Sequence, residues 1–125
     1  MLRRPRIIPR LAVKGSNVIV TVNLEGLRVA GKPADLARRY AEDADELLYT
    51  DSVASLYGRN QLENLIEETT AETFIPVTVG GGIASIHDAR RFFNAGADKV
   101  AVNTAALKRP ALITEMAGHF GSQAV

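Results

Sequence analysis

The chain repeats one pattern four times, in which a short apolar segment is followed by an amphipathic one. The apolar segments are typical of β-strands and cover Arg6 to Val13, Glu46 to Asp51, Ile75 to Val79 and Lys99 to Asn103. The amphipathic segments favour helices: one opened by Pro33, one over Gln61 to Thr73, one from a Ser85/Asp88 capping box to about Asn94, and one from Pro110 to near Gly118. Strands that alternate with helices predict an α/β fold with a parallel sheet.

Two architectures fit this alternation, a doubly wound sheet and part of a (β/α)8 TIM barrel. A whole barrel takes about 250 residues, and a chain of 125 residues would supply half. The β-rich segment Val18 to Leu24 is interpreted as an excursion after the first strand, and Ser122 to Val125 as the start of strand five. We therefore expect residues 1–125 to form one N-terminal half-barrel domain of about four βα units, without a linker.

Composition excludes several classes of function. Cysteine is absent and the two histidines are not clustered, so we expect no metal site, and nothing predicts a cofactor. Fifteen basic and fourteen acidic residues give a net charge of +1, which provides no general attraction to nucleic acid. No apolar run approaches the ~18 residues of a membrane helix. The basic start superficially resembles a transit peptide, but Pro5 and Pro9 disfavour its helix, and we expect a cytoplasmic protein.

The strand ends carry the candidate chemistry, because sites in parallel α/β folds lie at the carboxyl ends of strands. Gly80, Gly81 and Gly82 follow a strand and precede a capped helix. Glycines let backbone N–H groups approach phosphate oxygens, so these three predict a phosphate site, the alternative being a tight turn. Asn103 and Thr104 close the next strand and could bind the same phosphate or simply cap a helix.

Two further residues at strand ends are possible catalytic groups. Asp51 could orient substrate hydroxyls or move a proton, or it could cap a loop. Lys14 could contact a phosphate or carboxylate, although a solvated lysine is the simpler interpretation.

Seven segments in order carry a family resemblance: Arg6-Ile7-Ile8-Pro9, Val22-Asn23-Leu24-Glu25-Gly26-Leu27-Arg28, Ala44-Asp45-Glu46-Leu47-Leu48, Val77-Thr78-Val79-Gly80-Gly81-Gly82-Ile83, Gly96-Ala97-Asp98-Lys99-Val100, Val102-Asn103-Thr104-Ala105-Ala106-Leu107 and Phe120-Gly121-Ser122-Gln123-Ala124-Val125. Together they resemble the cyclase subunit of imidazole glycerol phosphate synthase, over the N-terminal half of that family's barrel. A sister isomerase of histidine biosynthesis shares the barrel and the glycine loop, but the segments after strand four favour the cyclase.

The resemblance implies a reaction and its partners. The family joins ammonia from a glutaminase subunit to a phosphoribulosyl carboxamide ribotide, giving imidazole glycerol phosphate and aminoimidazole carboxamide ribotide. This half would bind one substrate phosphate through Gly82, Asn103 and Thr104. Arg6, Glu46 and Lys99 match a charged gate to the ammonia channel, with a solvated salt-bridge ring as the alternative, and Asp98 matches a residue that faces the glutaminase.

The departures from the family pattern concern catalysis. The family's first catalytic aspartate falls at Ala12, whose methyl group cannot transfer a proton, and its second lies beyond Val125. Arg10 replaces a small residue on the same inward face of strand one. Loss of one general acid or base costs about 10²–10⁴ in rate, so we expect this chain to be inactive alone. Some paralogues that also lack the first aspartate are thought to deliver ammonia to another sugar substrate.

Two classes of function follow. The chain is either a cyclase-type lyase subunit that needs partners, or a non-catalytic phosphate-binding half-barrel. A half-barrel has open sheet edges and an apolar inner face, so we expect it to associate with a C-terminal half or with a second copy as a homodimer.

Overall fold

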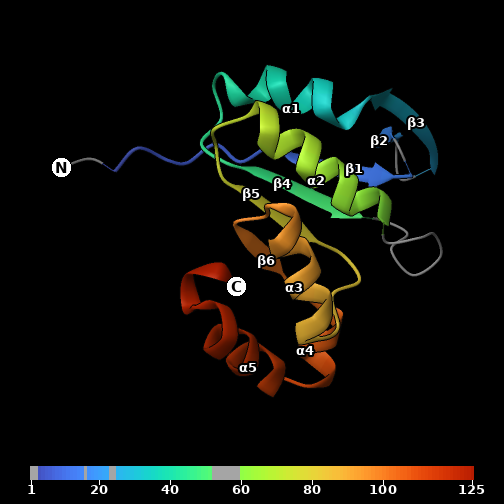
Figure 1. The fold of residues 1–125 in the computed structure, drawn as a ribbon. Helices are drawn as coiled ribbons and strands as arrows, with labels where there is room; N and C mark the ends of the chain where they lie inside the picture. Colours follow the sequence, from blue (N-terminus) through green and yellow to red (C-terminus); the bar gives the residue numbers. More distant parts are fainter. Residues whose placement is uncertain (1–2, 16, 23–24, 52–59) are drawn as a thin grey trace.

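The computed structural model describes residues 3–15, 17–22, 25–51 and 60–125. Its centre is a six-stranded sheet in the order β3-β2-β1-β4-β5-β6 (Figure 1). Strands β1 (Arg10–Lys14), β4 (Leu47–Asp51), β5 (Val77–Gly80) and β6 (Lys99–Ala101) are parallel neighbours in chain order. Strands β2 (Asn17–Val22) and β3 (Glu25–Gly31) form an antiparallel hairpin that extends the sheet from β1.

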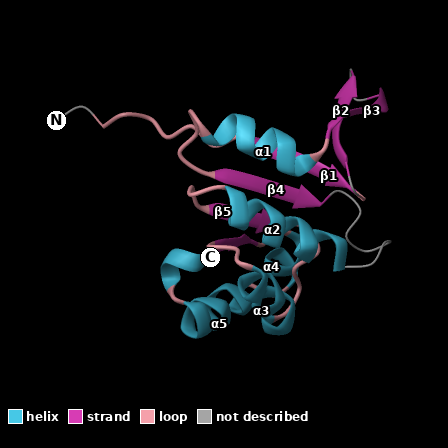
Figure 2. Ribbon diagram, turned by 45° about the horizontal axis from the view of Figure 1, so that its top comes forward, coloured by secondary structure: helices cyan, strands magenta, loops and turns pink. Residues whose placement is uncertain are grey.

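The helices lie along one face of the parallel strands (Figures 1 and 2). Helix α1 (Pro33–Ala41) packs against α2 (Asn60–Glu72), and α2 packs against α3 (Ile86–Ala95). The short α4 (Thr104–Lys108) and α5 (Ala111–Phe120) follow β6. Parallel strands in chain order with helices on one face are the arrangement of a (β/α)8 barrel, whereas a doubly wound sheet carries helices on both faces. The expected half-barrel fold is confirmed.

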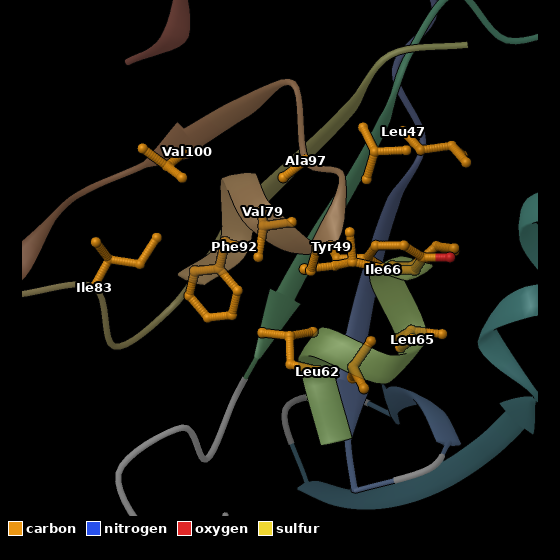
Figure 3. Close-up of a cluster of buried hydrophobic side chains, with 14 of the residues drawn as sticks. Leu47, Tyr49, Leu62, Leu65, Ile66, Val79, Ile83, Phe92, Ala97 and Val100 are labelled. Atoms are coloured by element: carbon orange, nitrogen blue, oxygen red, sulfur yellow. The ribbon is translucent and has the colours of Figure 1, made fainter. Parts of the chain in front are cut away.

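The hydrophobic core lies between the sheet and the helices, where alternate strand side chains meet α2 and α3 (Figure 3). Tyr49 is fully buried there, and its hydroxyl lies 2.7 Å from Oγ1 of Thr69 on α2. Burial raises the pKa of Tyr49 to about 12. The other buried strand residues that share this face are Leu11, Val13, Leu47, Val77, Val79 and Val100.

The opposite face of the parallel strands carries the other half of the alternation. Its side chains are all half-buried or exposed, and apart from Leu48 they are small, polar or charged: Arg10, Ala12, Thr50, Thr78, Lys99 and Ala101. In a closed barrel this face points inward. We refer to it below as the inner face.

Several element boundaries differ from the sequence prediction. The first strand begins at Arg10 and not at Arg6, because Pro9 has no N–H to donate and contributes only its carbonyl oxygen, which accepts from Leu48 N–H at 3.0 Å. Strand β6 ends at Ala101 and not at Asn103, whose φ of −128° and ψ of −84° are outside the strand region. Helix α5 continues two residues past Gly118, to Phe120.

One strand was not anticipated, one predicted segment has different bounds, and one segment was wrongly assigned. Strand β3 was missed because its sequence contains two glycines and two charged residues, and the pairing with β2 holds it in place. The β-rich segment predicted to end at Leu24 is strand β2, while Leu24 itself lies outside the described residues. The predicted strand at Ser122 to Val125 is wrong: Ser122–Ala124 forms a 3₁₀ turn in which Ala124 N–H donates to the Gly121 carbonyl at 3.1 Å.

Candidate functional site

An open cavity of about 800 Å³ lies at the carboxyl ends of the parallel strands. Three strand-end segments that the sequence singles out meet there, although they lie far apart along the chain. The predicted residues that line it are Asp51, Gly80, Gly81, Gly82, Asn103 and Thr104, and further lining residues include Arg10, Thr50 and Lys108. The fold therefore brings the predicted phosphate residues and one predicted catalytic candidate to one place.

The glycine loop has a conformation that only glycine adopts without strain. Gly81 has φ 108° and Gly82 has φ 66°, both in the left-handed half of the backbone map. A Cβ atom on Gly81 would lie 2.6 Å from the carbonyl oxygen of Asp51, so the backbone of the loop packs directly on the end of β4. The loop therefore has the positive φ angles that the tight-turn alternative requires. Because its glycines carry no side chains, the backbone of the loop forms part of the cavity wall.

The capping box predicted after the loop fixes the start of α3. Ser85 Oγ accepts the Asp88 N–H at 3.1 Å, as expected. The Asp88 carboxylate, which is buried, accepts the Ala84 N–H at 3.1 Å. These two bonds join the glycine loop rigidly to the helix.

Asn103 and Thr104 line the cavity from the end of the next strand. The backbone carbonyl of Asn103 accepts the Leu107 N–H at 3.0 Å, which begins α4, but its side chain makes no cap hydrogen bond to that helix. One turn later, Lys108 brings a cationic side chain to the same cavity.

Strand β1 reaches the cavity through Arg10 and not through its last residue. Arg10 Nε donates to Thr50 Oγ1 on β4 at 3.2 Å, and both residues line the cavity. Ala12 is half-buried on the inner face and pairs with Thr50 in the strand register. Lys14, the last residue of β1, is exposed and pairs with Asn17 on β2, and it is not among the lining residues.

The opposite end of the sheet carries a charged cluster. Glu46, only 5% exposed, accepts from Arg6 through Oε1, and the Lys99 ammonium lies 3.1 Å from the same oxygen. Beside them, Asp98 is exposed, and its Oδ2 accepts the Val77 N–H at 2.9 Å. The three predicted gate residues thus form one ion cluster, well away from the glycine loop.

The described part of the chain offers neither a metal site nor a membrane-spanning helix. Across residues 3–15, 17–22, 25–51 and 60–125, no group of three or more histidine, aspartate or glutamate side chains is placed to hold a metal ion. No helix in these ranges is long and apolar enough to cross a membrane.

Sequence reasoning missed the two cationic residues that line the cavity. Arg10 was noted only as a replacement, and Lys108 was not singled out. Arg10 could have been found from the alternation of strand side chains, because residues two apart lie on the same face and Arg10 therefore shares the inner face with Ala12. Lys108 lies one helical turn after Thr104 and therefore on the same side of α4. This relation could be used only once a helix was known to begin at Thr104.

Comparison with known proteins agrees with this geometry. A model of the histidine biosynthesis protein family matches residues 6–125. The chain is 56% identical to the "Imidazole glycerol phosphate synthase subunit HisF" of Legionella pneumophila over 96% of its own length and 57% of that protein's. The subunit of the same name from Thermobifida fusca is 51% identical over 94% of this chain and 46% of its own length.

The chain thus spans about half the length of the curated relatives it matches. The resemblance drawn from the sequence is confirmed, since these relatives are HisF-type subunits and the family match covers almost every residue. A parallel half-barrel, a glycine loop at its strand ends and a family match over residues 6–125 together place the chain in the histidine biosynthesis protein family.

Proposed function

We propose that the chain supplies the phosphate-binding half of a cyclase-type enzyme that adds ammonia to a phosphorylated sugar derivative. The observation that carries this proposal is the cavity at the strand ends, where the glycine loop, the Thr104 hydroxyl and two cationic side chains line one space. Backbone N–H groups, hydroxyls and cations are the donors that bind phosphate in proteins. The ligand is a sugar phosphate, and in the family's reaction it is the phosphoribulosyl carboxamide ribotide.

The charged cluster at the other end of the sheet supports a role in ammonia entry. Glu46 is buried and shared by Arg6 and Lys99, so its carboxylate holds two cations around one point. Rearranging either cation would open a passage along the inner face toward the cavity. We assign these residues to the ammonia gate, and exposed Asp98 beside them to the surface that meets a glutaminase subunit.

The chain does not carry out the acid–base chemistry by itself. The Ala12 methyl group stands on the inner face where a proton-transferring carboxylate would act. Asp51 lines the cavity and is the carboxylate best placed to orient substrate hydroxyls. Activity therefore requires a second half-barrel, either a C-terminal half or another copy of the chain, to cover the inner face in the cytoplasm.

A second candidate function rests on Ala12. With no carboxylate at this position, the subunit would deliver ammonia to a different sugar substrate instead of closing an imidazole ring, or would only bind phosphate without turnover.

An ammonia-dependent assay separates these functions. The chain is combined with the C-terminal half of a curated relative, and turnover of the ribotide with ammonium ions is measured before and after Ala12→Asp. A cyclase-type subunit gains at least about 100-fold from the restored acid or base. No gain, in a pair that assembles by light scattering, would reject the cyclase function and favour the second candidate. Gly81→Val tests the phosphate site in the same complex, because unchanged phosphate affinity would remove the glycine loop from it.

A further inference from the structure

We infer that Arg10 is a specificity-determining residue, which binds a second anionic group of the ligand whose phosphate lies at the glycine loop. This inference rests on the proposed phosphate site and goes beyond it. It defines the ligand class as a phosphorylated sugar with another acidic group, either a carboxylate or a second phosphate.

The first observation is how Arg10 is held. Its Nε donates to Thr50 Oγ1 at 3.2 Å, which ties the base of the guanidinium to the neighbouring strand. In the described part of the chain, Arg10 makes no other hydrogen bond or ion pair. The two terminal nitrogens of a guanidinium form a planar fork that matches the two oxygens of a carboxylate or phosphate. Thr50 therefore orients the fork while leaving its outer edge for a ligand.

The second observation is the charge of the cavity. Its lining contains two cationic side chains, Arg10 and Lys108, and one carboxylate, Asp51. Asp51 already takes part in an interaction within the protein. The walls of the cavity thus carry excess positive charge, which favours a ligand with more than one anionic group.

The third observation is spacing. Arg10 lies on β1 and the glycine loop follows β5, with only β4 between them. Neighbouring strands are about 4.8 Å apart, so the backbones of these two elements are separated by roughly 10 Å. Arg10 also lies level with Thr78, two residues before Gly80, through the shared partner Leu48. A sugar chain of five or six carbons spans such a gap, and a cavity of about 800 Å³ has room for it.

The test compares ligands with one and two anionic groups on the purified chain. Inorganic phosphate and glucose 6-phosphate carry one, 6-phosphogluconate adds a carboxylate, and fructose 1,6-bisphosphate adds a second phosphate. Isothermal titration at constant ionic strength gives each affinity for the wild type, Arg10→Gln, Arg10→Lys and Thr50→Val. Arg39→Gln, an exposed arginine on α1, is the matched control for lost surface charge.

The wild type should bind at least one two-anion ligand about tenfold or more tightly than glucose 6-phosphate, as expected for a charge-assisted hydrogen-bonded pair. Arg10→Gln should abolish this preference while changing inorganic phosphate affinity less than about twofold, and the ligand that loses most identifies the second group. Arg10→Lys and Thr50→Val should retain part of it, and Arg39→Gln all of it.

Equal weakening of one-anion and two-anion ligands by Arg10→Gln, or no weakening, would overturn the inference. So would a loss of the same size in Arg39→Gln, or a wild type without preference. A wrong assignment of the phosphate site itself would be recognised separately, because Gly81→Val would then bind inorganic phosphate as tightly as the wild type does.

Discussion

Replacing Gly81 by alanine is the substitution whose cost the structure defines most sharply. The new methyl group would lie 2.6 Å from the carbonyl oxygen of Asp51 and 3.0 Å from its amide nitrogen, and both are backbone atoms of β4 that cannot rotate away. The residue would also have to keep φ near 108°. Left-handed backbone strain costs about 1–3 kcal/mol, and overpacking costs about 1–3 kcal/mol more. We therefore expect Gly81→Ala to lower the free energy of unfolding by about 2–6 kcal/mol.

Urea unfolding followed by far-ultraviolet circular dichroism measures this loss. The matched control is Gly118→Ala, because Gly118 lies inside α5 and, apart from the neighbouring backbone of its own helix, nothing lies within 4 Å of the added Cβ. There alanine should raise stability by about 0.5–1 kcal/mol, since it favours the helix more than glycine does. A Gly81→Ala variant within about 0.5 kcal/mol of the wild type would contradict the packing of the loop on β4.

Three other substitutions test separate parts of the molecule. Tyr49→Phe should cost about 1 kcal/mol at pH 7 through loss of the Thr69 hydrogen bond. Because the folded pKa of Tyr49 is raised from 10.0 to about 12, the protonated hydroxyl stabilises the fold below pH 10 and this contribution is lost as the pH rises toward 12. Between pH 9 and pH 11 the wild type should therefore lose about 1 kcal/mol more than Tyr49→Phe in urea unfolding, and equal losses would contradict the burial of this hydroxyl. Ser85→Ala should destabilise by about 1 kcal/mol through loss of the α3 cap, and an unchanged thermal midpoint would argue against that cap. Glu46→Gln should lower the free energy of unfolding by about 1–2 kcal/mol at low salt, because two partly exposed cations lose the carboxylate that they share. The loss should be smaller at high salt, and a loss that does not depend on salt would argue against the ion cluster.

The sequence predicted most of the fold because its signals are local. Pro33 at the first turn of α1, the Ser85 cap of α3 and Gly96 after the end of α3 are each recognised within a few residues. All three signals stand where the structure begins or ends a helix. The errors fall where local residue preferences do not decide the outcome. Strand β3 exists through its pairing with β2. Ser122 to Val125 has strand-like residues, but its backbone closes into a turn.

The sequence also predicted most residues of the candidate site. The glycines, Asp51 and Thr104 could be placed together because carboxyl ends of parallel strands share one edge of the sheet. Arg10 could not, because its contribution depends on register: only the pairing of β1 with β4 brings its Nε to the Thr50 hydroxyl. Side chains that act across strands require the sheet alignment, which a single sequence specifies weakly.

The central claim is that the glycine loop and the residues after β6 bind phosphate. A titration of the ¹⁵N-labelled chain with inorganic phosphate, followed by two-dimensional NMR, tests it without any substitution. The account predicts saturable shifts concentrated at the amides of Gly80, Gly81, Gly82 and Thr104, with the ion cluster around Glu46 unaffected. Shifts confined to the arginine-rich start of the chain, or no saturable shift at the glycine loop, would contradict it.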